Sequence, residues 1–406
     1  MIPAGRVDQA DRGGGPVSRE DQRDGRVGQA DQGGGGMDWA GQALTAVLRR
    51  VTVTAEEVGP RFPLYADPAS GRWTTTGRGA WTGGFWAGLL WLRALASGGR
   101  ADRAAARECT AGLAGWAERD TATRGLILWY GTALADGTAD GLRERAAQAC
   151  LSAFDPELGL LPWGDAFGGP RLLARADGVP GLAPLLARAG DAGVAAARSH
   201  LTRHLDLCLG EDPPRPAWEA APGGGWRGCA EPAPGWSRTG AWLLLGVADG
   251  LALPEAPPQP GPRSGPSVGL SAGLSAGLWS AAGRLAALRL AEPAPPVPPA
   301  GPPGGPVDTS AAAIEAVAAL KLAALGASSG RPDEAGRLRA RAESVLRLLC
   351  ERHLSEPGAA RPAGMLLDGC YDADRGLAVR HELVWGDFFL ALGLAVLTGL
   401  TGPLTV

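Results

Sequence analysis

The chain has almost no lysine and no excess of either charge. Lys321 is the only lysine among 39 basic residues, and the formal net charge is −3 with a pI near 5.9. Proteins that bind nucleic acid usually carry a concentrated basic surface. The composition therefore predicts no nucleic-acid partner. Where one of the many arginines lines a pocket, its planar guanidinium is suited to binding carboxylates.

The six cysteines form no Cys-x-x-Cys pair and no cluster; they stand at positions 109, 150, 208, 229, 350 and 370. This scatter is typical of reduced thiols in a cytoplasmic protein, so we predict no disulfides. Cys350 and His353 have the spacing of two metal ligands, but no second pair accompanies them. A buried thiol and a surface histidine are favoured over a zinc site.

Signals for secretion or membrane insertion are also missing. The N-terminus has no basic-then-apolar leader, and the longest apolar run, 388–400, is too short to span a bilayer. Residues 1–36 are a crude glycine-rich duplication with little to bury, and we predict that they are disordered. Met37 is then an alternative start of translation. We expect a soluble cytoplasmic protein with one folded domain, residues 37–406.

Helix-forming sequence makes up most of that domain. Ala, Leu and Arg recur with a period of 3.6 residues, and strand candidates are few and short. Two Pro/Gly-rich tracts, 254–269 and 292–306, are predicted to be loops. Asp308 is a predicted N-cap. The predicted helices are 38–56, 81–97, 101–117, 122–135, 138–153, 177–190, 193–209, 237–251, 275–291, 309–326, 332–353 and 382–399. Twelve helices suggest six hairpins closed into an all-α (α/α)6 barrel; an open solenoid is the alternative, although no repeat period is present.

Tryptophan is unusually common among the aromatic residues. The chain has fourteen tryptophans against six phenylalanines and three tyrosines, and the densest groups, 80–91 and 235–242, lie beside glycines at predicted helix starts. A tryptophan there offers a flat apolar face and an N–H donor to a sugar. Each one alone is better explained as a core residue. The set as a whole favours a sugar-binding cavity.

Three aspartates stand at predicted junctions between loops and helices: Asp120, Asp177 and Asp387. Each one alone is a plausible helix cap. In a barrel of hairpins, alternate helix ends converge on one cavity, where two nearby carboxylates have separated pKa values and one can donate a proton. Arg238 lies between Trp236 and Trp242 and is expected either to hold a substrate carboxylate or to pair with a neighbouring acid.

Several segments, in order over residues 38–400, together resemble the unsaturated glucuronyl hydrolases of glycoside hydrolase family 88 and the related unsaturated rhamnogalacturonyl hydrolases of family 105. Three segments look like the family 88 pattern: Arg61-Phe-Pro, Trp81-Thr-Gly-Gly-Phe-Trp-Ala-Gly-Leu-Leu-Trp-Leu92 and Trp385-Gly-Asp-Phe-Phe389. The segment that begins Asp177-Gly-Val-Pro-Gly-Leu is spaced like its family 105 counterpart. Both families have counterparts of Trp236-Ser-Arg-Thr-Gly-Ala-Trp242 and Asp308-Thr-Ser-Ala-Ala-Ala-Ile314.

The resemblance implies an (α/α)6 barrel that acts on unsaturated uronic acids at the non-reducing end of oligosaccharides. An acid protonates C4 of the vinyl ether, water adds at C5, and the hemiketal opens to release the aglycone. By the same resemblance Asp177 is the general acid/base, and Asp120 positions the sugar and raises the pKa of that acid. The implied pocket residues are Trp81, Trp163, Trp236 and Trp242, with Arg238 near the uronate. No metal or organic cofactor is implied.

The sequence departs from the family 88 pattern at several polar positions. Arg119 stands where a histidine is usual, and Trp218, Trp226 and Arg227 occupy a stretch that carries histidines and a glutamine. We expect Arg119 and Arg227 to offer alternative contacts for an anion. Two other functions remain open, a barrel that binds carbohydrate without turnover and another α-toroid enzyme such as a terpene or lanthionine cyclase. The cyclases lack support because neither an Asp-rich motif nor a zinc-binding set of Cys and His is present.

Overall fold

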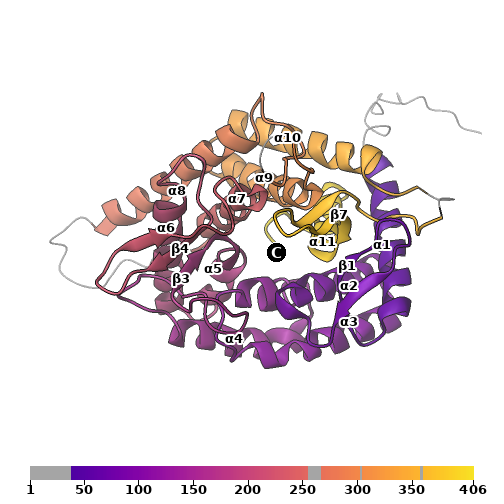
Figure 1. The fold of residues 1–406 in the computed structure, drawn as a ribbon, viewed down its shortest axis with the longest axis horizontal. Coiled ribbons are helices and arrows are strands. Elements are labelled where there is room, and N and C mark those ends of the chain that lie inside the picture. Colours follow the sequence, from indigo (N-terminus) through magenta and orange to yellow (C-terminus); the bar gives the residue numbers. More distant parts are fainter. Residues whose placement is uncertain (1–37, 255–266, 302–303, 357–359) are drawn as a thin grey trace, which may run out of the picture. The chain divides into compact units, whose positions relative to one another are not determined.

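The computed structural model describes residues 38–254, 267–301, 304–356 and 360–406. The predicted disordered segment 1–36, the alternative start at Met37 and most of the tract 254–269 lie outside these ranges. The described chain is mostly helical, as predicted (Figure 1). The helices are α1 (Asp38–Val58), α2 (Gly83–Ser97), α3 (Arg100–Gly112), α4 (Asp140–Ser152), α5 (Leu182–Ala187), α6 (Asp191–Cys208), α7 (Ser237–Leu251), α8 (Ser267–Arg289), α9 (Thr309–Ser328), α10 (Pro332–Arg352) and α11 (Val384–Leu397).

Each of these helices overlaps a predicted one, and the structure shows the causes of the differences. The helix predicted at 122–135 is reduced to one π-helical turn, η3 (Gly125–Trp129). Here the backbones pack so closely that a Cβ on Gly125 would lie 2.3 Å from the carbonyl oxygen of Pro180. α5 is shorter than predicted because Pro180 disfavours helix before it and Gly181 is left-handed, with φ 69°. α8 begins at Ser267, so the predicted loop was wrong over 267–269.

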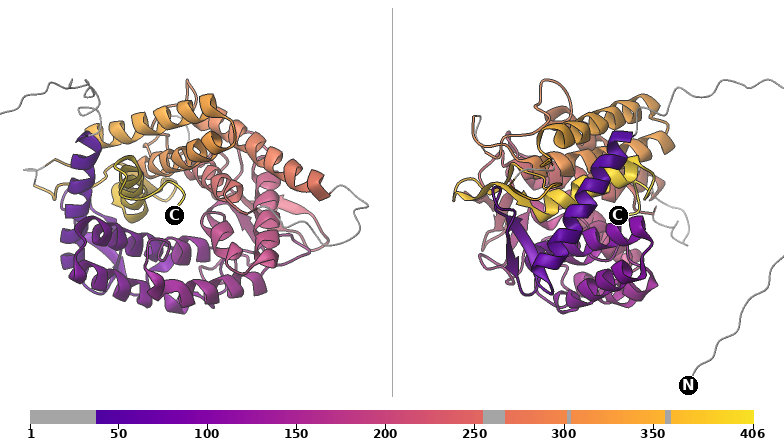
Figure 2. Two further views of the ribbon diagram at one scale, coloured as in Figure 1. Left: turned by 180° about the vertical axis from the view of Figure 1, so that it is seen from behind. Right: turned by 90° about the vertical axis from the view of Figure 1, so that its right-hand side faces the viewer.

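Alternate segments of the chain contact one another in a closed circuit. α2 contacts η3, η3 contacts α5, and the circuit continues through α7, α9 and α11 back to α2. The remaining helices pack outside these inner segments: α3 on α2, α4 on η3 and α5, α6 on α5, α8 on α7, α10 on α9 and α1 on α11. Figures 1 and 2 show this arrangement from the two faces and from one side.

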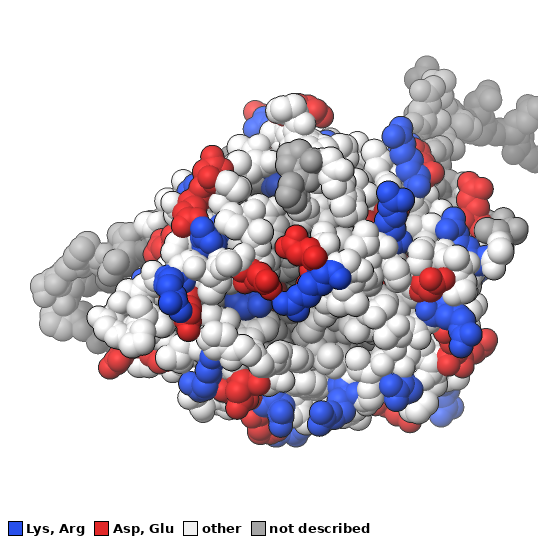
Figure 3. Space-filling view, in the orientation of Figure 1, with Lys and Arg blue, Asp and Glu red and all other residues white. Residues whose placement is uncertain are grey.

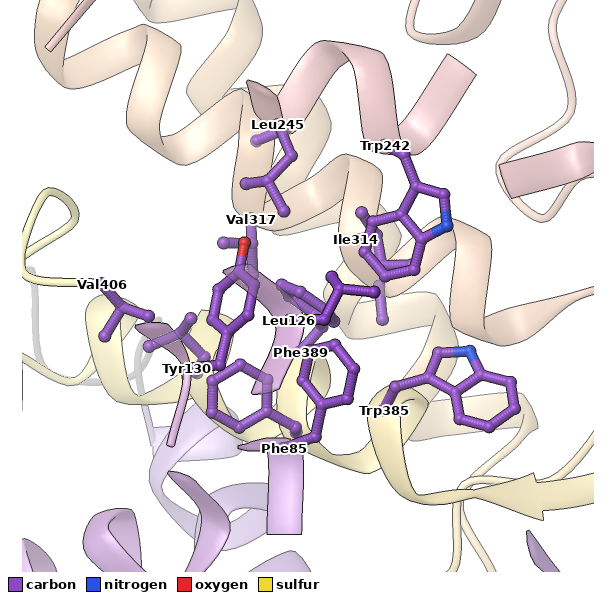
Figure 4. Packing of buried hydrophobic residues seen from close by; sticks show 14 of the residues in the cluster. Phe85, Leu126, Tyr130, Trp242, Leu245, Ile314, Val317, Trp385, Phe389 and Val406 are labelled. Atoms are coloured by element: carbon purple, nitrogen blue, oxygen red, sulfur yellow. The ribbon is translucent and has the colours of Figure 1, made fainter. Parts of the chain in front are cut away.

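Most residues of the inner helices α7, α9 and α11 are buried, as expected for helices with little solvent-facing surface. α9 is long and apolar enough to cross a membrane by length and composition, but 89% of the relevant window is buried within the fold. Figure 4 shows Phe85, Trp242 and Phe389 packed together; the ring centroid of Trp242 lies 6.4 Å from that of Phe85 and 5.7 Å from that of Phe389. Trp242 is only 1% exposed. It is a core residue and not the pocket wall that was predicted.

Two small antiparallel sheets connect helices that are distant in sequence. The first has the order β2-β1-β7-β6 and consists of β1 (Phe62–Ala66), β2 (Trp73–Thr76), β6 (Gly369–Asp372) and β7 (Leu377–Leu383). The second has the order β3-β4-β5 and consists of β3 (Leu173–Arg175), β4 (Ala217–Ala220) and β5 (Trp226–Gly228), with Trp218 opposite Gly228. β3 leads directly into the segment that carries Asp177.

Candidate active site

A cavity of about 430 Å³ lies beside the β3-β4-β5 sheet. This volume is in the range of small-molecule sites. Its lining consists of Trp163, Gly168, Gly169, Pro170, Leu173, Arg175, Glu219, Arg227, Gly228, Cys229, Ala230 and Glu231. Of the predicted site residues, Trp163 and Arg227 are therefore in the lining. On the face shown in Figure 3, acidic and basic side chains lie close together around a hollow near the middle.

Asp177 is held by an arginine two residues before it. Arg175 has extended backbone (φ −129°, ψ 137°), and the 3₁₀ turn η5 (Ala176–Gly178) begins directly after it. Arg175 Nε and Nη2 each donate a hydrogen bond of 3.0 Å, to Oδ1 and Oδ2 of Asp177 respectively. The contact is a bidentate ion pair whose two side chains are only 24% and 17% exposed.

Trp163 lies against the same arginine. The guanidinium carbon of Arg175 is 4.4 Å from the centroid of the Trp163 ring, a cation–π contact. The backbone N–H of Trp163 donates to the carbonyl of Leu173, 2.9 Å away, which fixes the tryptophan beside β3. Trp163 lines the cavity, and its role as a wall of the sugar pocket stays a prediction; Arg175 was not predicted.

Asp120 reaches the same region through the backbone. The N–H of Ala122 donates to the carbonyl of Trp163 (3.0 Å), and a Cβ on Gly164 would lie only 2.1 Å from the carbonyl oxygen of Asp120. The Asp120 carboxylate accepts a hydrogen bond of 2.7 Å from Nε of Arg171. The structure thus links both predicted aspartates to Trp163, and each carboxylate is paired with an arginine.

An aromatic cluster adjoins these groups. Trp81 Nε1 donates to the hydroxyl of Tyr371 (3.1 Å), and the ring of Trp385 lies 4.9 Å from Trp81 and 5.3 Å from Tyr371, centroid to centroid. Tyr371 interacts electrostatically with Arg175 and Asp177. Burial raises the pKa of Tyr371, so its hydroxyl keeps its proton at neutral pH. Sequence reasoning missed this tyrosine because β6, which carries it, was not predicted.

Arg238 forms the salt bridge that was the alternative to substrate binding. Its Nη1 donates to Oδ2 of Asp308 (2.6 Å) and to the carbonyl of Cys370 (2.5 Å), and its Nη2 donates to the carbonyl of Tyr371 (2.7 Å). The guanidinium lies 4.5 Å from the ring centroid of Trp236. The Arg238 side chain is 4% exposed. These contacts leave it little capacity to bind a substrate carboxylate.

The remaining predicted arginines differ in position. Arg119 is exposed. Arg227 is 75% exposed, lines the cavity and pairs with Glu219 at 2.5 Å. The two tryptophans in the stretch that departs from family 88 lie on the same sheet, Trp218 on β4 and Trp226 on β5, and both are half-buried.

Asp387, the third aspartate noted in the sequence, lies outside the cavity. It is buried at the start of α11 next to Glu382, whose carboxylate accepts a bond of 2.7 Å from Nη2 of Arg50. Burial, and then the charge of Glu382, hold the pKa of Asp387 well above its usual range. Asp387 therefore belongs to a buried cluster with Glu382 and Arg50, away from the cavity.

The cysteines and histidines of the described chain form no metal centre. No group of three or more His, Cys, Asp or Glu side chains suited to a metal occurs among the described residues. Nδ1 of His353 lies 2.8 Å from Oδ2 of Asp368, and burial raises the pKa of the Cys350 thiol to about 12. All six cysteines are free thiols.

No protein-family model matches the sequence, and no curated protein does. Solved structures match over nearly the whole chain. An unsaturated glucuronyl hydrolase specific for heparin has a TM-score of 0.74 at 18% identity, covering 90% of this chain and 98% of that chain. The unsaturated glucuronyl hydrolase from Bacillus sp. GL1, responsible for the degradation of glycosaminoglycan, has a TM-score of 0.72 at 23% identity, covering 88% and 96%. The enzyme from Streptococcus agalactiae has a TM-score of 0.69 at 17% identity, covering 90% and 92%.

These identities are low, so the comparison establishes a shared fold. The solved structures are enzymes of the kind that the sequence resembles, and the chain has their helical fold.

Proposed function

We propose that the protein is a glycoside hydrolase that removes unsaturated uronic acid residues from the non-reducing end of oligosaccharides. The observation that carries this proposal is the position of Asp177, directly after β3 and beside a cavity of about 430 Å³ with Trp163 and an arginine in its wall. A sugar site needs an aromatic face, and a uronate needs a cation. The shared fold with unsaturated glucuronyl hydrolases supports the same reading.

In this proposal the fold is a single (α/α)6 barrel of six helical hairpins over residues 37–406. The closed circuit of inner segments, from α2 through η3, α5, α7, α9 and α11, supports the proposal, because each has an outer helix packed against it. η3 then takes the place of one inner helix. We further propose that the enzyme works in the cytoplasm, on oligosaccharides that polysaccharide lyases have already released.

The proposed reaction is hydration of the vinyl ether. Asp177 in its protonated form donates a proton to C4, and water adds at C5, assisted by the resulting carboxylate as general base. The hemiketal formed at C5 opens and expels the rest of the oligosaccharide. Asp120 would bind hydroxyls of the sugar. Proton transfer and water are sufficient for this chemistry, so we propose no metal or organic cofactor.

A carbohydrate-binding protein without turnover is the second candidate, and one observation favours it. Asp177 is paired with Arg175 through both oxygens, an arrangement that suits a carboxylate and not an acid. The missing family histidines favour the same alternative.

The decisive experiment follows the ultraviolet absorbance of the substrate's conjugated double bond, which hydration destroys. The purified full chain would be mixed with unsaturated disaccharides from chondroitin, hyaluronan, heparin, gellan and rhamnogalacturonan. Loss of absorbance with at least one of them is the expected result. If none loses its absorbance while one or more still binds, the protein is a binding protein and the enzymatic proposal is wrong.

A further inference from the structure

Every charged side chain in the cavity lining is already paired within the described structure. Arg227 pairs with Glu219, and Glu231 pairs with Arg375 at 2.8 Å. Both of those pairs reach solvent, since Arg227 is 75% and Glu231 72% exposed. The pair between Arg175 and Asp177 is the least exposed of the three, and Arg175 belongs to the cavity lining. An anion that enters deeply must therefore compete for Arg175.

The same pair conflicts with the proposed chemistry. A carboxylate that accepts two hydrogen bonds from a guanidinium is stabilised in its ionised form. A general acid must hold a proton before it can donate one. Asp177 can act on the substrate as an acid only after its contact with Arg175 has been broken.

We propose, on the basis of the proposed function, that Arg175 binds the substrate's own carboxylate and that this carboxylate displaces Asp177. The exchange replaces one carboxylate on the guanidinium with another. Asp177, released and mostly buried, takes up one proton from solvent and becomes the neutral acid that the reaction needs. Charge balances, because one substrate anion and one proton enter the site together. Binding of a uronate therefore produces the protonated acid. A neutral sugar has no carboxylate to displace Asp177 and leaves its contact with Arg175 intact.

The surroundings of Arg175 fit this role better than those of Arg238. Trp163 supports the guanidinium plane from one side, 4.4 Å away, so the arginine stays in place while its partner changes. Arg238, by contrast, is fixed by Asp308 and two backbone carbonyls and is only 4% exposed. A guanidinium presents the same bidentate geometry to any carboxylate. Arg175 is therefore a specificity-determining and positioning residue.

The first test compares an unsaturated chondroitin disaccharide with the methyl ester of its uronate. The wild type is expected to prefer the acid by about 30-fold in kcat/KM, the value of one charged hydrogen-bonded contact. Arg175→Gln should lose nearly all of this preference. Arg175→Lys keeps the positive charge but not the bidentate geometry of the guanidinium, so its preference should be intermediate. Arg339→Gln is the control, because Arg339 forms an Arg–Glu pair on α10, 2.9 Å long, away from the cavity. Circular dichroism checks that each variant is folded.

The second test measures proton uptake on binding by titration calorimetry in buffers of different ionisation enthalpy, with a saturated uronic acid disaccharide that keeps the carboxylate but has no double bond to hydrate. Uptake close to one proton near neutral pH is expected, and it should disappear in the Arg175→Gln or Asp177→Asn variant. If the wild type hydrates the disaccharide but Arg175→Gln keeps the preference for acid over ester, or if no proton is taken up, the inference is overturned and the enzymatic function stands. If the wild type neither binds nor hydrates any unsaturated uronide, both proposals fail.

Discussion

Asp308 holds Arg238 in a fully buried ion pair, with Oδ2 of the aspartate 2.6 Å from Nη1 of the arginine and exposures of 0% and 4%. The same aspartate caps α9, since its Oδ1 accepts from the N–H of Ser310, and its Oδ2 also accepts from the hydroxyl of Ser237. The Asp308 side chain therefore links the start of α7 to the start of α9. Its contacts hold the Arg238 guanidinium against the Trp236 ring.

Asp308→Asn is expected to lower the free energy of unfolding by about 3–5 kcal/mol, because it leaves the Arg238 charge buried without its partner. Urea denaturation would measure the change. The matched control is Asp136→Asn, since Asp136 also caps a helical turn and pairs with an arginine, Arg107, but lies at the surface. Its loss should cost about 1 kcal/mol. Equal losses of unfolding free energy in the two variants would contradict a larger contribution from the buried Asp308–Arg238 pair.

Asp177→Asn is expected to abolish hydration of unsaturated disaccharides, with a loss of at least about 100-fold in kcat, because the amide cannot donate the proton to C4. The helical circular dichroism should stay unchanged, since Asp177 is on a short turn and not within a helix. Asp165→Asn is the control, an exposed aspartate two residues after Trp163. Survival of activity in Asp177→Asn would remove this aspartate from the mechanism.

Trp163 and Trp242 were predicted to share one pocket, but Trp163 lines the cavity and Trp242 packs in the core, so we expect different phenotypes. Trp163→Ala is expected to raise KM or lower kcat strongly, because Arg175 loses the ring that supports it. Trp242→Ala is expected to lower the free energy of unfolding by about 3–5 kcal/mol through the cavity it leaves in the core, with KM little changed in the protein that remains folded. Steady-state kinetics and urea denaturation of both variants separate the two roles. A KM effect from Trp242→Ala alone would contradict the assignment.

The helices were predictable because their signals are local. Periodic Ala and Leu, and an aspartate before the run at 309, determine α9 almost to the residue. The exception, 122–135, fails for a reason that is not local, because Gly125 packs directly on the backbone near Pro180. The strands were missed because each is short and is stabilised by hydrogen bonds to another strand, as in the pairing of Leu173 with Glu219.

The site was predictable only in part for the same reason. Asp120, Asp177 and Trp163 were predicted from the family resemblance, and hydrogen bonds and an arginine contact connect the segments that carry them. Arg175 has no such signal, because its contact with Asp177 depends on the 3₁₀ turn η5 after β3, where the sequence predicted a helix over 177–190. Whether an arginine pairs with an acid of the protein or binds a ligand depends on its burial. Arg238 is an example, because Asp308, seventy residues away, occupies the position expected for the substrate carboxylate.

The buried carboxylate of Glu315 is expected to make the free energy of unfolding depend on pH. Its carboxylate accepts from Nε and Nη2 of Arg289 at 2.7 and 3.2 Å, yet it is only 2% exposed. Burial outweighs the arginine and raises the pKa of Glu315 to about 7 from an ordinary value of 4.5. The folded state then binds the proton more tightly than the unfolded state does. The resulting stabilisation is complete below the ordinary value and is lost as the pH rises toward 7.

The free energy of unfolding of the wild type relative to Glu315→Gln should therefore fall as the pH rises from about 5 to about 7, by up to roughly 1.4 kcal/mol per pH unit. Urea denaturation of both proteins at several pH values gives this difference directly, because other titrating groups cancel. Glu343→Gln is the matched control, since Glu343 also accepts from an arginine, Arg339, but outside the core, and the fall in the Glu315 difference should exceed any change in the Glu343 difference. A difference that rises with pH would mean that the pairing with Arg289 outweighs burial, because a carboxylate with a lowered pKa stabilises the fold only where it is ionised.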